Sequence, residues 1–492
     1  MKLAYPNAVL LLVLSLFSAC TDEQASDAGA GETSPGAAGE NGLGAGGDPA
    51  AEASAGQGQA GSTPERSSDA GASSGGAAGD AGAGAVIEAG AAGASMGAAG
   101  AAAAGGGGAD PGNGHVLVKQ LAGGWGFSCA LTQAGGVRCW GDGSYGALGD
   151  GTPLVDSELL HTATNVAGLT QGVKKIAAGG WNVCAIKSDD TVVCWGLNAY
   201  HALAIDSASH GSSSPVALNG FTAAALDVTV AFDYSGTTSH GCVVDSASKV
   251  LCWGDNSSYQ LGVTTPATSS ALIPVTGLSG FKAVTAGESF TCGLTSAGGV
   301  NCWGSDVQAQ LGDGLGSRLT PPTALPVQVV GLTSGVKQVV ANVRTACAVT
   351  TAGGVKCWGA GSAGQLGSNV ALDPDPGGVT TPADVSGLSS GVVQLAGAYR
   401  HYCALLQDHT VRCWGYNQNG QLGDQPATIT INQFESIPLE VVGVSNAVAV
   451  GTGLSQSCAA LATGGVQCWG SGYASGSLKS TNQIVPTFVN GL

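Results

Sequence analysis

The chain is poor in charge, and it is poorest in positive charge. Charged residues make up only 10% of its 492 residues, and 16 Lys+Arg stand against 33 Asp+Glu. A protein that binds nucleic acid needs a surplus of cations to neutralise phosphates, so this shortage argues against nucleic acid as a partner. Neither the strongly acidic residues 21–115 nor the less acidic residues 116–492 supply that surplus of cations.

The chain also lacks a hydrophobic run long enough to cross a bilayer near its start. The apolar segment 8–17 has about ten residues, too few for a ~30 Å hydrocarbon core, and it lies between Lys2 and the sequence Ser18-Ala19-Cys20. This pattern predicts an export signal over residues 1–20 that ends in a lipobox, with Cys20 as the lipidated residue. We expect an exported protein anchored by lipid at the outer membrane or cell surface. The alternative is an ordinary secretory signal and a secreted protein.

Large aliphatic and aromatic side chains are almost absent from residues 21–115, which consist mainly of Gly, Ala, Ser and acidic residues. Such a segment cannot bury enough apolar area to offset the entropy lost on ordering. It is therefore predicted to be a disordered, low-complexity tether with a root-mean-square span of roughly 50–60 Å. The folded domain is expected over residues 116–492.

Helical periodicity is missing from residues 116–492, and a repeat takes its place. The pattern Cys-x9-Cys-Trp-Gly occurs seven times, about every 55 residues. Short apolar runs separated by Gly and Ser at this interval are typical of four-stranded propeller blades. The sequence predicts an all-β, seven-bladed propeller whose repeated tryptophans form the blade cores, at Trp140, Trp195, Trp253, Trp303, Trp358, Trp414 and Trp469.

The cysteine spacing fits an antiparallel hairpin. If Cys129 faces Cys139, the pairs between them leave a three-residue loop that ends in Gly135, where a left-handed residue is required. Directly opposed residues lie close enough for a disulfide, whereas zinc knuckles use shorter Cys spacings. Seven local disulfides are predicted: Cys129–Cys139, Cys184–Cys194, Cys242–Cys252, Cys292–Cys302, Cys347–Cys357, Cys403–Cys413 and Cys458–Cys468.

A Pro-x-x-Val-x-Gly-Leu segment precedes later repeats but not the first, and one more copy stands at 485–492. We expect this last copy to complete the first blade and so to close the ring by a shared sheet.

The run Gly-x-x-x-x-Cys-Ala-Leu, then Gly-Gly-Val-x-Cys-Trp-Gly and Gly-Gln-Leu-Gly, resembles the regulator of chromosome condensation repeat. The segment 414–423 is the nearest unit, and the resemblance extends over residues 116–492. It implies a seven-bladed propeller but fixes no activity, since relatives include exchange factors, a photoreceptor and enzyme inhibitors. The family often has His two residues before the first Cys position, and only His240 and His401 keep it here. Paired cysteines suit an exported member.

Clusters of catalytic or metal-binding residues are also lacking. The seven His are scattered, and His201 and His210, on either side of an insert, are more typical of solvated loops than of ligands. The acidic run 373–378 lacks the alternating ligands of a calcium loop. We predict no catalytic residue, no metal and no cofactor.

The turns before the first Cys of each repeat vary in sequence. Propellers collect equivalent loops on one face, so these turns predict an aromatic and cationic ligand-binding patch of Trp125, Trp181, Arg344, Tyr399, Arg400 and His401. The alternative is that these side chains only fill the central channel. A rival surface would be formed by the tyrosines that follow the Trp-Gly pairs, Tyr145, Tyr200, Tyr259, Tyr416 and Tyr473.

The sequence favours a monomeric binding module that recognises a protein or a cell-envelope ligand and reaches the membrane through its lipid. Two alternatives stay open: a secreted enzyme inhibitor similar to propeller-type β-lactamase inhibitors, and a polysaccharide hydrolase or lyase. Three or more carboxylates or histidines at one channel mouth would favour the enzyme.

Overall fold

The computed structural model describes residues 114–154, 160–205, 209–231, 239–315, 321–369, 378–424, 433–472, 476 and 482–492. Residues 1–113, with the predicted signal, Cys20 and most of the tether, lie outside them. The described chain forms seven four-stranded antiparallel sheets, each built from four consecutive strands, as the sequence predicts.

In each of the first four blades the strands follow chain order from the innermost to the outermost position. They are β1 Val118–Gly123, β2 Phe127–Thr132, β3 Val137–Asp142 and β4 Leu160–Asn165; β5 Val173–Gly179, β6 Asn182–Lys187, β7 Val192–Leu197 and β8 Gly211–Ala217; β9 Ala225–Val230, β10 His240–Asp245, β11 Val250–Asp255 and β12 Thr268–Pro274; β13 Phe281–Ala286, β14 Phe290–Thr295, β15 Val300–Gly304 and β16 Thr323–Gln328.

The last three blades follow the same order. They are β17 Val336–Ala341, β18 Thr345–Thr350, β19 Val355–Gly359 and β20 Val379–Asp384; β21 Val392–Ala398, β22 His401–Leu406, β23 Val411–Tyr416 and β24 Phe434–Glu440; β25 Ala447–Thr452, β26 Gln456–Leu461, β27 Val466–Gly470 and β28 Gln483–Phe488. Two short 3-10 helices, η1 Ser144–Gly146 and η2 Ala199–His201, follow the third strands of blades one and two.

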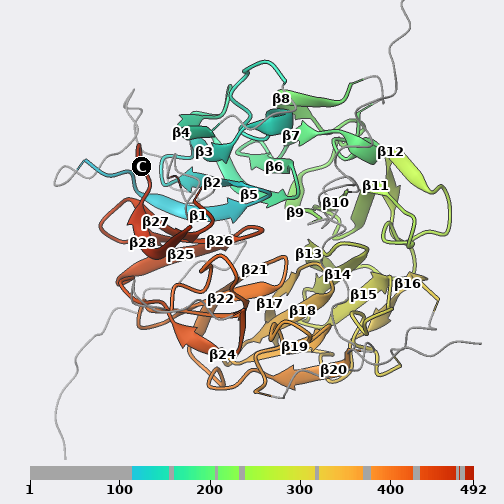
Figure 1. The fold of residues 1–492 in the computed structure, drawn as a ribbon. Coiled ribbons are helices and arrows are strands. Elements are labelled where there is room, and N and C mark those ends of the chain that lie inside the picture. Colours follow the sequence, from blue (N-terminus) through green and yellow to red (C-terminus); the bar gives the residue numbers. More distant parts are fainter. Residues whose placement is uncertain are drawn as a thin grey trace, which may run out of the picture. The chain divides into compact units, whose positions relative to one another are not determined.

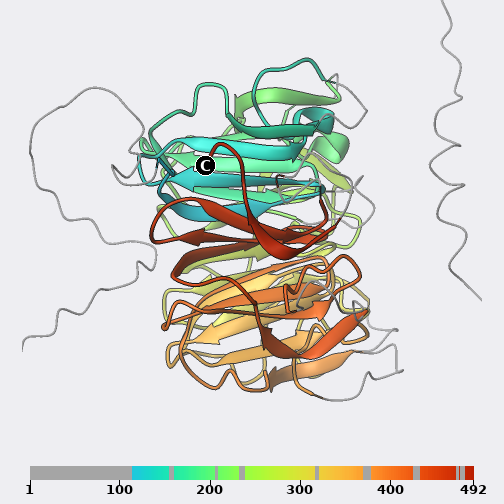
Figure 2. The same cartoon turned by 60° about the vertical axis from the view of Figure 1, so that its left-hand side comes forward.

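The first strands of the blades surround a common axis (Figure 1). Each contacts the first strands of both neighbouring blades, and β25 contacts β1, so the ring is closed. Seen from the side, the strands run across the view (Figure 2). The propeller thus has two ends. We call the end with the turns between first and second strands, such as 124–126, the turn end, and the end with the hairpins between second and third strands, such as 133–136, the hairpin end.

All seven predicted disulfides are present, and each joins directly paired residues of the second and third strands of a blade. The predicted loop geometry is also confirmed, since Gly135, Gly298, Gly353 and Gly464 have φ values of 84°, 83°, 82° and 87°. Because L side chains rarely adopt this conformation, glycine is favoured there.

The repeated tryptophans are all fully buried, and their position explains the Leu-Gly signature. Trp358 donates its indole N–H to the carbonyl oxygen of Gln310 in the preceding blade at 2.9 Å, and Trp414 bonds Gln365 in the same way at 3.0 Å. A Cβ on Gly312 would come within 2.7 Å of the Trp358 ring. The glycine of one blade therefore lets its turn cover the tryptophan of the next.

Inner strands are also joined by side chains. Gln338 accepts from the backbone N–H of Leu395 in blade six and donates to its carbonyl oxygen, at 2.9 and 2.8 Å. Gln120 binds Ile176 in the same two-sided way. Each such residue thus extends the hydrogen bonding of one sheet into its neighbour.

The predicted strand exchange at the ring seam is wrong. β28 pairs with β27 in blade seven, while blade one has an outer strand of its own, β4. The segment 160–169 carries the Val-x-Gly-Leu part of the motif as Val166-Ala167-Gly168-Leu169, but Ala163 stands where β28 has Pro486. The proline-based pattern therefore missed it, and seven repeats contain seven outer strands without any exchange.

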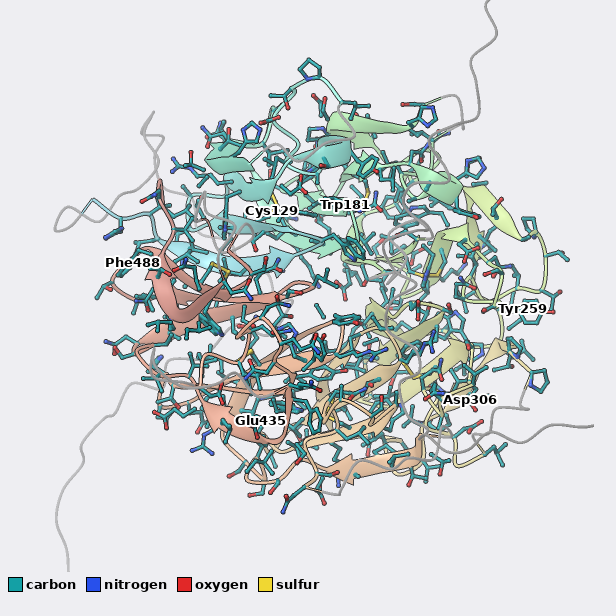
Figure 3. The ribbon with its side chains drawn as sticks, in the orientation of Figure 1. Cys129, Trp181, Tyr259, Asp306, Glu435 and Phe488 are labelled. Carbon is teal, nitrogen blue, oxygen red and sulfur yellow. A yellow bond between two sulfur atoms is a disulfide. The ribbon has the colours of Figure 1, made fainter. Side chains whose placement is uncertain are left out.

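Residues 488–492 still join the two ends of the described chain by packing. Val489 and Leu492 belong to the apolar cluster around Trp140 of blade one. The backbone N–H of Ala163 donates to the carbonyl oxygen of Asn490 at 3.4 Å, and the His115 ring stacks on Phe488 at 5.2 Å. His115, which the sequence assigned to the tether, is thus part of the folded domain (Phe488 is labelled in Figure 3).

None of the described residues lies in a helix long and apolar enough to span a bilayer.

Candidate functional site

The turns that carry the predicted patch and the loops that carry the rival tyrosines lie at the same end of the propeller. First strands end, and second strands begin, where third strands end and fourth strands begin. Tyr145 contacts Trp181 edge-on at 5.4 Å, and Tyr416 contacts Tyr399 edge-on at 5.6 Å. The two predicted surfaces therefore meet at the turn end, where Tyr145 and Tyr416 join residues of the predicted patch.

Backbone hydrogen bonds link turns from neighbouring blades. Leu454 of blade seven donates to Gly124 of blade one at 3.1 Å, and Trp125 donates to Gly180 of blade two at 2.7 Å. This approach requires glycine, because a Cβ on Gly124 would lie 2.5 Å from the carbonyl oxygen of Gly180. The turns thus form a fixed chain rather than independent loops.

An apolar cluster sits on this chain. Val343 and Tyr399, from blades five and six, are buried, and Trp125, Tyr416 and Leu454 pack against them while keeping part of their surface exposed. Trp125 continues the cluster to Trp181 of blade two, with ring centroids 5.9 Å apart. Side chains from blades five, six, seven, one and two therefore form one surface, which we call the aromatic cluster: Trp125, Tyr145, Trp181, Val343, Tyr399, Tyr416 and Leu454.

Two predicted cations border the aromatic cluster. The guanidinium carbon of Arg400 lies 5.3 Å from the centroid of the Tyr399 ring, a cation–π distance. Arg344 donates from Nε to the Glu288 carboxylate at 3.0 Å, and its side chain is 47% exposed. Both cations are held in place without being removed from solvent.

His401 lies apart from this group, because its side chain is fully buried between blades six and seven. Its Nε2 is 3.0 Å from the Ser457 hydroxyl, which itself donates to the carbonyl oxygen of Gln421. His401 must then donate from Nε2. Burial lowers the pKa of His401 to about 4. The prediction that His401 belongs to the surface patch is therefore wrong, because its side chain is buried.

His240 shows that the position is structural. It is fully buried and contacts the Thr291 hydroxyl of blade four at 2.9 Å, and burial lowers its pKa to about 3. At the same register Gln456 donates to the carbonyl oxygen of Phe127 across the seam at 2.9 Å. The sequence contains a signal for this role, because His401 and His240 occupy the same repeated position two residues before the first Cys, at the start of a second strand.

The remaining tyrosines are not part of the aromatic cluster. Tyr200 is 48% exposed, and Tyr259 lies at the rim of the ring in Figure 3, farther from its centre than Trp181. Tyr473 lies outside the described residues.

Within the described residues, no three His, Cys, Asp or Glu side chains come together as metal ligands would. His201 contacts the carbonyl oxygen of Ile205 in its own loop at 3.3 Å. Residues 373–377 of the acidic run lie outside the part of the chain that the structure describes.

Comparison with known proteins supports the repeat. Residues 118–147, 173–205, 281–310 and 392–421 match the Regulator of chromosome condensation (RCC1) repeat. Four of the seven repeats of this propeller thus match the RCC1 repeat. The ultraviolet-B receptor UVR8 of Arabidopsis thaliana is 26% identical over 388 residues, which cover 76% of this chain and 81% of UVR8. The human E3 ubiquitin-protein ligase HERC2 is 28% identical over 315 residues, or 62% of this chain, but this chain spans only 6% of HERC2.

Solved structures share the fold. Yeast RCC1 (Prp20), in its complex with Kap60, superposes with a TM-score of 0.63 at 21% identity, over 77% of this chain and 85% of that one. Human WBSCR16 superposes with a TM-score of 0.61 at 22% identity, over 72% of this chain and 94% of that one. This chain therefore shares the fold of RCC1-type propellers.

Proposed function

We propose that this protein is a binding module that holds a protein partner at the turn end of its propeller. The observation that carries the proposal is the aromatic cluster, whose side chains come from five blades and whose turns in blades seven, one and two are linked by backbone hydrogen bonds. A fixed surface loses little conformational entropy on binding. Trp, Tyr and Arg are the residues that contribute most at protein interfaces.

The relatives support protein binding in general. The structure of yeast RCC1 (Prp20) contains Kap60, and Prp20p is described with binding to Gsp1p and histones. At 21–22% identity this likeness concerns the fold, so we propose the mode of action and not those partners. Ligase activity is not proposed, because the match covers only 6% of HERC2.

The test uses the purified full chain as bait in an extract of envelope proteins. We expect a specific protein to be captured by the wild type and lost with Trp181→Ala, which removes the ring that Trp125 and Tyr145 contact. The matched control is Lys356→Ala at the hairpin end, whose side chain pairs with Asp384 on the next strand. If Trp181→Ala captures the same protein as strongly, the turn end is not the binding surface.

We also propose that the chain is exported, lipidated at Cys20 and tethered by residues 21–113, so that the propeller stands as a monomer outside the cytoplasm. Seven disulfides support an oxidising compartment. Cys20→Ser is expected to abolish lipidation and to leave the protein uncleaved or released. The check is partition between detergent and water together with gel mobility. Unchanged partition and mobility would reject the anchor and leave the propeller's binding role untouched.

A further inference from the structure

The two ends of the propeller differ in charge. Among the described residues, two cations lie toward the turn end, Arg344 and Arg400, with eight carboxylates: Asp142, Asp150, Asp255, Glu288, Asp306, Asp313, Asp424 and Glu435. Ten cations lie toward the hairpin end with only seven carboxylates. The cations there are Lys119, Arg138, Lys174, Lys175, Lys187, Lys249, Lys282, Lys337, Lys356 and Arg412. Most of the cations in the described part of the chain therefore lie at one end.

Several of these cations occupy one repeated position. The second residue of each inner strand lies at a β-bulge near the hairpin end. It is lysine in blades one, two, four and five, at Lys119, Lys174, Lys282 and Lys337. Within the described residues Lys174 pairs with Asp190, whereas Lys119 and Lys282 pair with no carboxylate. Their charge is therefore available to an external anion.

The same position carries exposed aliphatic side chains in the other blades. Leu226 of blade three is 45% exposed and Val448 of blade seven is 39% exposed, while Val393 of blade six is partly buried. Around the axis this position thus forms an amphipathic rim, which we call the lysine rim: Lys119, Lys174, Leu226, Lys282, Lys337, Val393 and Val448. Around the ring the position reads Lys, Lys, Leu, Lys, Lys, Val, Val, so two pairs of cations are separated by aliphatic side chains. This mixture suits a lipid headgroup region better than a soluble polyanion, which offers nothing apolar to contact.

The chain enters the propeller at this end. The carbonyl oxygen of Val116 accepts from Gly465, beside the β26–β27 hairpin, and a Cβ on Gly464 would touch His115. The described chain therefore begins at the end that carries the lysine rim.

We propose that the hairpin end docks on an anionic lipid surface, with the lysine rim in contact with the headgroups and the turn end facing away. Anionic lipids attract basic groups at a protein surface, and each Lys near the membrane contributes about 1 kcal/mol to the free energy of binding. The inference relies on the proposed anchor only to bring the propeller near a membrane; the contact itself is made by the rim. It would leave the aromatic cluster free for a partner.

The experiment uses the full chain carrying Cys20→Ser, so that no attached lipid contributes. Binding is measured by sedimentation with vesicles of phosphatidylethanolamine and phosphatidylglycerol, and with vesicles of phosphatidylcholine. We expect preference for the anionic vesicles, lost at high salt. Lys119→Gln with Lys282→Gln should weaken binding to them by about five-fold for each lysine removed.

The matched control removes the same charge from the other end. Arg344→Gln with Arg400→Gln should leave vesicle binding nearly unchanged, and equal losses in the two double variants would overturn the proposal. A third variant, Leu226→Ser with Val448→Ser, separates lipid from soluble polyanions. It should weaken vesicle binding several-fold; if only the lysine variant does so, the rim binds polyanions and not a membrane surface. Because no partner protein or lipid anchor is involved, failure here leaves the proposed binding function intact.

Discussion

The blades and the turns of this propeller follow different rules. Every blade repeats one disulfide pair, one buried tryptophan and one close turn at a fixed register. The turns between first and second strands differ in every blade, from Trp125 to Glu288 to Tyr399. The contacts that all seven blades share lie in the paired strands and around the buried tryptophans, and not in the side chains of these turns. The comparison teaches that the contacts common to all blades and the side chains of the proposed binding surface belong to different residues of each repeat.

A tryptophan from each class gives the largest expected difference. Trp358 is fully buried and bonded to Gln310, so Trp358→Ala should lower the free energy of unfolding by about 4 kcal/mol. Trp181 is partly buried in the aromatic cluster, and Trp181→Ala should cost only about 1 kcal/mol. Urea unfolding measures both. Similar losses would mean that the aromatic cluster is a structural plug of the channel and would remove the distinction between blades and turns.

The repeated half of this comparison could be predicted from the sequence. Cys-x9-Cys fixes a hairpin with a three-residue loop, and seven copies at similar spacing fix the number of blades. These features depend on local geometry, which one repeat already contains. The aromatic cluster could be predicted only in part. Trp125 and Tyr399 come from equivalent turns, which the repeat reveals. That Tyr145 and Tyr416, from a second set of loops, join the cluster can be learned only from the folded structure.

Two predictions failed for physical reasons. The proline pattern does not recognise β4, because this strand has Ala163 in place of proline, and the sequence therefore predicts a shared sheet at the seam. The sequence groups His401 with Tyr399 and Arg400 as one turn, but the turn ends at Arg400 and His401 begins β22. As the first residue of β22 it points into the boundary with blade seven.

The next largest effect is expected from acid, which should lower the free energy of unfolding through two histidines buried between blades. The pKa values of His240 and His401 are lowered by burial to about 3 and about 4, from an ordinary value of 6.5. The unfolded chain therefore binds these protons first, so stability is full above pH 6.5 and is lost as pH falls toward 4. At pH 5 each histidine should cost about 2 kcal/mol relative to pH 7.5. Urea unfolding at both pH values measures the loss.

A variant taken from the chain itself serves as the control. Gln456 fills the equivalent position in blade seven, so His240→Gln with His401→Gln should fold while losing most of the difference between pH 5 and pH 7.5. A variant that is as sensitive to acid as the wild type would show that other groups titrate and that these boundaries are not weakened by proton uptake.

The smallest expected effect concerns an irregular residue within the repeated blades. Asp306 stands where blades two, three and six have Asn198, Asn256 and Asn417, and like them it accepts the N–H of the leucine five residues on, here at 3.0 Å. Its Oδ2 is buried without a hydrogen-bond partner in the described chain. Burial, with a smaller effect of Asp313, raises the pKa of Asp306 to about 6. The folded state therefore holds this proton more tightly than the unfolded state.

Stability must then fall as pH rises from 3.8 toward 6, and the cost persists above pH 6. Asp306→Asn keeps the acceptor and removes the charge, so it should stabilise the protein by about 1 kcal/mol at pH 7.5, and by less at pH 5. Thermal unfolding at the two pH values measures the gain. The mirror variant Asn256→Asp, which loses the amide bonds to Val263 and Pro266, should destabilise at pH 7.5. If Asp306→Asn gains nothing at pH 7.5, the carboxyl is solvated and the irregular position has no energetic consequence.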